Sequence, residues 1–226
     1  MSAIFFGSIS TLADTSEVQR RAFNEAFSAH DLDWNWSQEQ YRSMLGSNGG
    51  ADRVSDYAKS VGSDVDAAAV HATKSEIFQK LLADSGVQPR PGVVDTVDTA
   101  KAEGVSLGLV TTTSQANVDA LLSALEPHIG ADTFDVVVVK DTVDQPKPDG
   151  ACYEWALQRL GIDAGDAVAI EDNVGGVKSA AAAGVACIAF PNENTAGGDF
   201  SAAAQTVDHL DQHQVISLAA TERTAR

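Results

Sequence analysis

The stretch that decides the fold is AIFFGSISTLADT, residues 3–15. Its first four residues are apolar and predict a short buried strand. Gly7 and Ser8 then indicate a turn, and Ser10-Thr11-Leu12 indicates the start of a helix. A buried strand that leads through a glycine turn into a helix favours an α/β fold.

Apolar strands and helical patterns alternate after about residue 90, which extends that interpretation. The expected strands are 105–110, 134–139, 167–170 and 186–190. The expected helices are 93–102, 114–125, 148–160 and a helix that Asn173 caps and that runs to residue 183. Short continuous apolar strands joined by helices predict a parallel, Rossmann-like sheet with helices on both faces, to which the strand at 3–7 belongs.

Residues 15–88 differ from the rest of the chain because they contain helical patterns and no convincing strand. The expected helices are 17–29, 38–45, 51–61 and 65–84. The sequence therefore predicts a helical domain at 15–88, inserted into an α/β core of residues 1–14 and 89–220. Residues 221–226 are expected to form a frayed polar tail.

Composition excludes some classes of function. The chain has 32 acidic and 15 basic residues, a net charge of −17, which argues against binding to nucleic acid. Cys152 and Cys187 are isolated in helical and apolar contexts, so we expect two buried thiols rather than a disulfide or a metal site. The chain shows neither a basic leader with an apolar segment nor an apolar run of membrane-spanning length, so the expectation is a cytoplasmic protein without membrane contact.

Polar residues follow the expected strands where they end, at the edge at which open α/β sheets bind ligands. Thr111-Thr112-Thr113-Ser114 offers hydroxyl and backbone N–H groups that either cap a helix or bind a phosphate. Lys147 lies between two prolines and is either a positioned cation or a loop lysine in solvent. Glu171 and Asp172 either cap the next helix or bind a hard divalent cation.

The hydroxyl cluster, the Lys-Pro pair and the Glu-Asp pair occur in an order that resembles the haloacid dehalogenase superfamily. That resemblance implies phosphate binding by Thr111, Thr112 and Lys147, with Lys147 also serving catalysis. It further implies a Mg²⁺ ion held by Asp172, by Glu171 and by the backbone carbonyl of Ile9.

The segments QRRAFNE at 19–25 and DWNW at 33–36, with the glycines at 49 and 50, resemble the CbbY subgroup, close to β-phosphoglucomutase. This resemblance implies a sugar bisphosphate phosphatase acting on xylulose 1,5-bisphosphate, with a helical cap that grips the distal phosphate. It implicates Arg53 and Lys74 in that grip, although both are equally consistent with surface charges. A His and a Lys expected in the cap are replaced by Gln19 and Ala51.

The opening motif departs from the family pattern at its chemistry. The nucleophilic Asp falls at Gly7, the acid/base Asp at Ile9 and the turn Gly at Ser10. Loss of a nucleophile in another hydrolase costs a factor on the order of 10⁶ in turnover, about 8 kcal/mol. We therefore expect a catalytically impaired homologue with a weakened or absent Mg²⁺ site.

Three functions remain open from the sequence. The first is a protein, monomeric or weakly dimeric, that still binds a phosphorylated small molecule such as a sugar phosphate or bisphosphate. The second is an active Mg²⁺-dependent phosphatase of altered mechanism that uses Asp14 or a residue of the insert. The third is a structural or interaction protein with a vestigial cleft.

Overall fold

The computed structural model describes residues 1–45 and 49–220, so the predicted tail at 221–226 lies outside the described residues. Its core is one parallel sheet with the strand order β3-β2-β1-β4-β5-β6. The strands are β1 (Ala3–Phe6), β2 (Ser106–Val110), β3 (Val136–Val138), β4 (Ala167–Glu171), β5 (Ala186–Ala189) and β6 (Gln205–Thr206). The predicted α/β class is confirmed.

Helices cover both faces of the sheet because the strands are apolar on both sides. Ile4 and Phe6 of β1 point to one face, and Ala3 and Phe5 point to the other. The first face packs against α6 (Val93–Glu103), α7 (Gln115–Leu125) and α10 (Gln212–Ala220). The second packs against α8 (Ala151–Leu160) and α9 (Val174–Ala182).

The strand register brings the candidate site residues to one edge. Phe6 of β1 is level with Leu109 of β2 and with Ile170 of β4. Gly7, Val110 and Glu171, which follow these three positions, therefore lie level with one another at the carboxyl edge of the sheet. Gly7 begins the turn after β1, and its N–H donates to the carbonyl of Ile170 at 2.8 Å.

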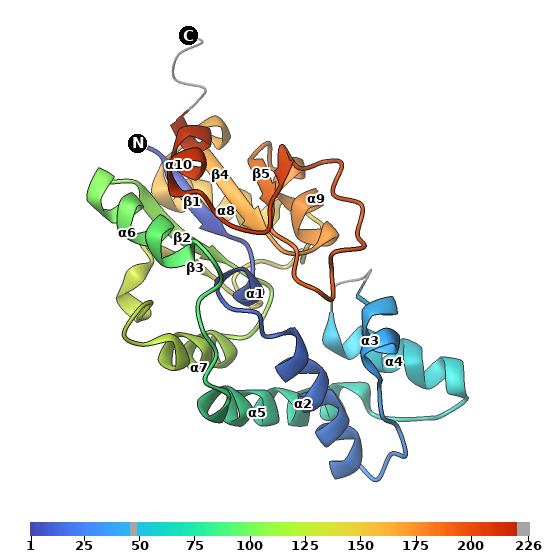
Figure 1. Ribbon diagram of the computed structural model, residues 1–226. Coiled ribbons are helices and arrows are strands. Elements are labelled where there is room, and N and C mark those ends of the chain that lie inside the picture. Colours follow the sequence, from blue (N-terminus) through green and yellow to red (C-terminus); the bar gives the residue numbers. More distant parts are fainter. Residues whose placement is uncertain (46–48, 221–226) are drawn as a thin grey trace.

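A helical insert lies between the short helix α1 (Ile9–Leu12) and α6. It contains α2 (Ser16–Ala29), α3 (Gln38–Ser43), α4 (Gly50–Val61) and α5 (Ala67–Ser85). Figure 1 shows these helices gathered beyond the carboxyl ends of the central strands. The insert has an apolar cluster of its own, which includes Phe23, Phe27 and Trp36. The described residues of 15–88 contain no strand, as the sequence indicates.

Some boundaries differ from those expected. The helix expected from residue 148 begins at Ala151, because residues 146–149 form a turn in which the Asp149 N–H donates to the Pro146 carbonyl at 3.1 Å, and Gly150 precedes the helix. The strand expected at 134–139 is reduced to β3. The strand β6 and the helix α10 were not anticipated, and β6 is only two polar residues long, so no apolar run announced it.

Two further expectations can be compared with the structure. Both cysteines are buried free thiols, as predicted. Among the described residues, no helix is both long and apolar enough to cross a bilayer.

Candidate functional site

Lys147 is the centre of the candidate site. Its ammonium group donates to the carbonyl of Gly7 after β1, to the carbonyl of Val110 at the end of β2 at 2.7 Å, and to Glu171 Oε1 at 2.6 Å. Only 5% of the residue is exposed. The alternative of a loop lysine in solvent is therefore excluded, because this lysine joins the ends of three central strands.

Glu171, the last residue of β4, is the counter-charge of Lys147. Its Oε1 also accepts a hydrogen bond from the Tyr153 hydroxyl at 2.6 Å. The residue is completely buried, and burial raises the pKa of its carboxyl group, a rise that Lys147 opposes in part. The pKa of Tyr153 is raised well above its ordinary value, first by burial and then by the Glu171 charge. The hydroxyl therefore stays protonated and donates.

Asp172 is held by neutral donors. Its Oδ1 accepts from the Ser8 hydroxyl at 2.8 Å and from the Asn173 side-chain amide at 2.9 Å. Its Oδ2 accepts from the Asn192 side-chain amide at 3.3 Å. Asn173 caps α9 by accepting from the Gly176 N–H at 2.9 Å, so the acidic pair does not serve as the cap.

The residues predicted to hold a magnesium ion, Asp172, Glu171 and the Ile9 carbonyl, do not fit such an ion. Position 7 supplies no carboxylate, the Glu171 carboxylate is turned to Lys147, and the Ile9 carbonyl accepts from the Ala13 N–H at 3.3 Å. Asp172, whose given hydrogen-bond partners are neutral, would be left as the carboxylate ligand of the predicted set, and the affinity for a hard cation follows the number of charged ligands. Within residues 1–45 and 49–220, no group of three or more His, Cys, Asp or Glu side chains is arranged to hold a metal ion.

The threonine cluster follows β2 beside Lys147. Thr111 is buried, its N–H donates to the Val138 carbonyl, and its hydroxyl oxygen accepts from the Thr113 N–H at 3.2 Å. Ser114 caps α7 by accepting from the Asn117 N–H at 3.4 Å. The capping function therefore belongs to Ser114, and the partly exposed Thr112 is left outside it. Phosphate binding by Thr111 and Thr112 stays a prediction.

Lys74 of the insert is a buried cation and not a surface charge. It is 3% exposed, and its ammonium donates to Gln19 Oε1 at 2.7 Å between the rings of Phe23 and Phe78. Burial, with a smaller contribution from the charge of Arg53, lowers the pKa of Lys74 to about 7. Arg53 lies over the Tyr41 ring and donates to the Met44 carbonyl at 3.0 Å.

His71 and Tyr41 are two residues of the insert that the sequence analysis missed. Burial and the positive charges of Lys74, Lys140 and Arg53 together lower the pKa of His71 to about 4, and Lys140 follows β3 in the chain. Burial also raises the pKa of Tyr41, with a smaller contribution from the Asp172 charge. His71 and Tyr41 are therefore within electrostatic reach of Lys140 and Asp172, which follow strands of the sheet or lie at their carboxyl ends.

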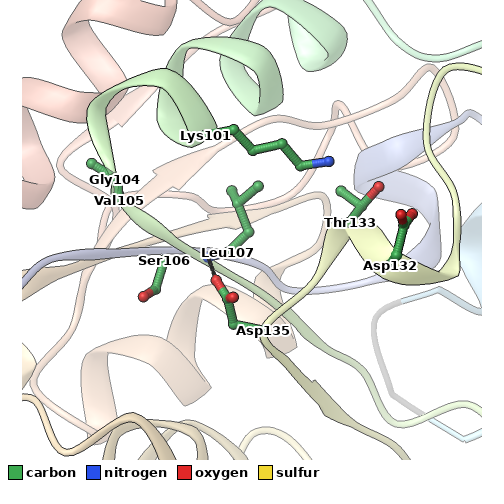
Figure 2. A pocket seen from close by; sticks show the side chains of 8 residues that line it. All are labelled: Lys101, Gly104, Val105, Ser106, Leu107, Asp132, Thr133 and Asp135. Carbon is green, nitrogen blue, oxygen red and sulfur yellow. Dashed lines mark hydrogen bonds between the residues drawn. The ribbon is translucent and has the colours of Figure 1, made fainter.

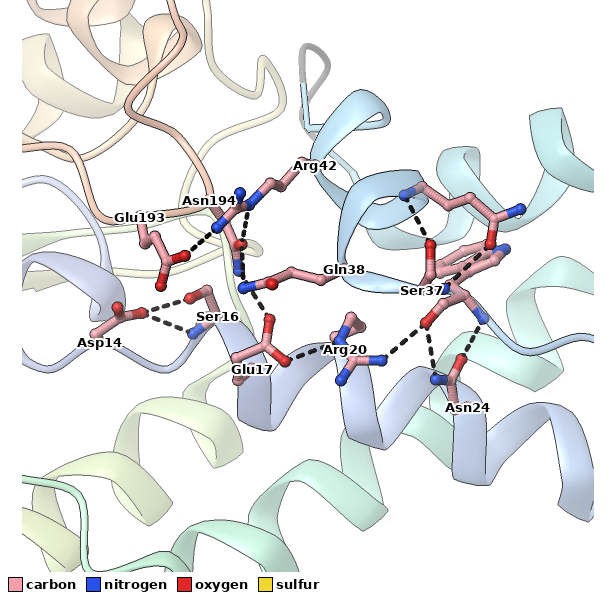
Figure 3. A network of polar contacts seen from close by, with 12 residues as sticks. Asp14, Ser16, Glu17, Arg20, Asn24, Ser37, Gln38, Arg42, Glu193 and Asn194 are labelled. Carbon is pink, nitrogen blue, oxygen red and sulfur yellow. Dashed lines mark hydrogen bonds and ion pairs between the residues drawn. The ribbon is translucent and has the colours of Figure 1, made fainter.

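A polar network joins the insert to the core (Figure 3). Asn194 accepts from Arg42 Nε at 2.7 Å and from the Gln38 amide at 3.4 Å, and it donates to Glu17 at 3.2 Å. Arg42 also pairs with Glu193 at 2.5 Å. Residues 192–194 follow β5 as polar residues follow the other strands, and this signal in the sequence could have identified them.

Asp14, the nucleophile considered for an altered mechanism, is held by Ser16 at the start of α2. Its Oδ1 accepts from the Ser16 N–H at 3.0 Å and from the Ser16 hydroxyl at 2.5 Å (Figure 3).

Arg90 is another residue that the sequence analysis missed. It donates to the carbonyls of Ser10, Phe190 and Pro191 and so fixes the segment that leads from the insert back into the core.

A hollow of about 280 Å³ lies at the opposite edge of the sheet, where β2 begins. Figure 2 shows Lys101, Asp132 and Asp135 around it, with the Asp135 carboxylate accepting from the Leu107 N–H at 2.9 Å. It shares no residue with the strand ends described above, and open α/β sheets bind ligands at the other edge. We therefore do not assign it to the candidate site.

The fold and the order of the site residues define the class of protein, and comparison with known proteins agrees. A family model described as haloacid dehalogenase-like hydrolase matches residues 10–190, so the chain belongs to that family. The matched residues begin after positions 7 and 9, which carry Gly and Ile.

Within that family the chain is similar to proteins named CbbY. It is 42% identical to Protein CbbY of Rhodobacter capsulatus over 206 residues, which are 90% of this chain and 91% of the relative. It is 38% identical to Protein CbbY of Cereibacter sphaeroides, over 91% of each chain. The crystal structure of CbbY from Rhodobacter sphaeroides in complex with phosphate matches with a TM-score of 0.86 at 37% identity, over 92% of this chain and 94% of that one. A mutant of that CbbY was solved in complex with xylulose-(1,5)bisphosphate, and it matches with the same TM-score at 36% identity.

Proposed function

We propose that this protein binds a phosphorylated sugar between the helical insert and the carboxyl edge of the sheet, without the phosphoryl transfer of its active relatives. The observation that carries the proposal is the contrast at the end of β1. Lys147 still joins the strand ends there, while positions 7 and 9 carry Gly and Ile. A lysine suited to a phosphoryl group is present, and the nucleophile and the acid/base group are not.

The ligand we propose carries two anionic groups. One would lie against Thr111, Thr112 and Lys147, and the second against the insert near Arg53 and Lys74. The complexes of CbbY from Rhodobacter sphaeroides with phosphate and with xylulose-(1,5)bisphosphate support a sugar phosphate as the ligand class. A second negative charge near Lys74 would stabilise its charged form, which burial disfavours.

The insert at 15–88 would then act as a cap on the core formed by 1–14 and 89–220. The contacts of Asn194 with Arg42 and Glu17 support this division, because they join the two parts beside the strand ends. The net charge of −17 further favours a small ligand over nucleic acid.

The test has a binding arm and a turnover arm. Binding of xylulose 1,5-bisphosphate and of inorganic phosphate is measured by calorimetry on the full chain, and phosphate release is measured with added magnesium. We expect binding without turnover, a rate on the order of 10⁶ below that of an enzyme with its nucleophile in place. The variant Gly7→Asp, Ile9→Asp, Ser10→Gly provides the comparison, and we expect it to gain magnesium-dependent release.

Phosphate release by the natural chain at ordinary enzymatic rates would overturn the impaired-enzyme part of the proposal. Absence of binding to both ligands would overturn the binding part and would favour a vestigial cleft.

A further inference from the structure

The Glu171 carboxylate fills the space that a side chain at position 7 would need. A Cβ atom built on Gly7 would lie 2.1 Å from Glu171 Cδ and 2.5 Å from the Tyr153 hydroxyl oxygen. On the other side, a Cβ atom built on Gly176 would lie 2.0 Å from Glu171 Oε2. The position of this carboxylate therefore depends on two glycines, one after β1 and one in the first turn of α9.

Only half of the carboxylate is satisfied in this place. Oε1 accepts from Lys147 and from Tyr153, each at 2.6 Å. Oε2 is buried and, among the described residues, has no hydrogen-bond partner. A buried carboxylate with an unsatisfied oxygen is costly, and the ion pair with Lys147 offsets that cost. The charge of Lys147 therefore holds Glu171 in the cradle between the two glycines.

Glu171 is also the one exchangeable partner among the three acceptors given above for Lys147. An ammonium group has three N–H donors, and the Lys147 ammonium donates to the carbonyls of Gly7 and Val110 and to Glu171 Oε1. The two carbonyls belong to the backbone at the strand ends and cannot turn away without disturbing the sheet. The Glu171 carboxylate, in contrast, stands at the end of a side chain that can rotate.

We infer that Glu171 is a built-in competitor for the phosphoryl group, holding Lys147 in the place that a phosphoryl oxygen would take and thereby setting the affinity of the core anion site. This inference rests on the proposed function, since it concerns the affinity of the same site. A phosphate monoester or inorganic phosphate binds at Lys147 only when the carboxylate leaves the cradle. If it stays, two anions share one cation in a buried place, which is electrostatically unfavourable.

The charge arm of the test removes the competing negative charge. Calorimetry with inorganic phosphate compares the natural full chain with Glu171→Gln, which keeps the shape and the hydrogen-bonding oxygen. We expect the affinity for phosphate to rise at least tenfold. Glu154→Gln is the matched control, because it removes the same charge from an exposed position on α8, and we expect its affinity to equal that of the natural chain.

The steric arm displaces the carboxylate without changing any charge, and it decides the question if Glu171→Gln does not fold. The new methyl group of Gly7→Ala would occupy the cradle and expel Glu171, so we again expect tighter phosphate binding. Gly197→Ala is its control, because a Cβ atom there meets nothing within 4 Å. Circular dichroism verifies that each variant is folded.

The outcomes separate this inference from the proposed function. Tighter binding in Glu171→Gln or in Gly7→Ala, with both controls unchanged, supports the competitor. Phosphate binding that is equal in the natural chain and in both folded site variants overturns the competitor and leaves the proposed function standing. Absence of phosphate binding in every protein overturns the core anion site, and the inference falls with it.

Discussion

Lys147 and Lys74 are two buried lysines, 5% and 3% exposed, in different surroundings. Lys147, in the core, has a carboxylate 2.6 Å away and two backbone carbonyls. Lys74, in the insert, has a neutral amide oxygen and two aromatic rings. Burial alone favours the loss of a lysine's charge, and only a counter-charge prevents that loss. The core thus supplies its own anion, whereas the insert leaves the charge of Lys74 dependent on what binds nearby.

Removal of Lys147 gives the largest expected change in stability. Lys147→Met leaves the Glu171 carboxylate buried with only the Tyr153 hydroxyl as a partner. Breaking a buried ion pair from one side costs about 3–5 kcal/mol of the free energy of unfolding, which urea denaturation measures. Lys178→Met, on the exposed face of α9, is the control. A loss below about 1 kcal/mol would mean that the pair is not buried in solution.

Lys74 is expected to make stability depend on pH in the opposite sense to a paired lysine. Its pKa in the folded protein is about 7, below the ordinary 10.5, so between these values the unfolded chain binds more protons. Stability therefore rises with pH in this window, and the penalty for the buried charge is complete below pH 7. Relative to Lys74→Met, the natural chain should gain about 2 kcal/mol between pH 7 and pH 9 in urea titrations.

The exposed Lys80→Met variant on the same helix is the control for the pH series, and we expect it to follow the natural chain. If natural chain and Lys74→Met change in parallel from pH 7 to pH 9, Lys74 has a counter-charge in solution and the contrast with Lys147 disappears.

The pair Arg42–Glu193 adds a third case, a cation with a carboxylate near solvent. The two side chains are 36% and 76% exposed, so Arg42→Ala should cost only about 0.5–1 kcal/mol of unfolding free energy. Because Arg42 also binds Asn194, we expect faster hydrogen exchange in α3, which mass spectrometry detects. Arg21→Ala, which removes an exposed pair within α2, should leave the exchange of α3 unchanged. Unaltered exchange in Arg42→Ala would show that this network does not restrain the insert.

Much of the fold could be predicted because its signals are local. Continuous apolar runs such as 3–6 and 167–170 predict strands buried on both faces, and the glycine and threonine that follow two of the strands mark the ligand-binding edge. The exceptions are also local in origin. β6 consists of Gln205 and Thr206 and has no apolar run, and α8 starts later than expected because residues 146–149 form a turn.

The site was predictable as a set of positions and not as a set of contacts. The order of the motifs predicted that Thr111, Lys147 and the acidic pair lie at neighbouring strand ends. In the structure, the Lys147 ammonium contacts Val110 beside Thr111 and Glu171 of the acidic pair. It could not show that Tyr153 reaches Glu171 or that Ser8 and Asn192 reach Asp172, because these partners come from separate elements. Nor could it distinguish Lys74 from a surface charge, since burial depends on how α2 packs against α5.

The sequence by itself determined the parallel sheet, the helical insert and the absence of carboxylates at positions 7 and 9, because periodicity and residue identity are properties of the chain. Only the tertiary structure decided what Glu171 does. That carboxylate could bind a divalent metal ion or pair with Lys147. The outcome depends on the space between Gly7 and Gly176 and on the position of Lys147, which comes from a third segment of the chain. Space and low dielectric arise when distant segments pack together, and within that enclosure the ion pair is the arrangement that best offsets the cost of burying two charges.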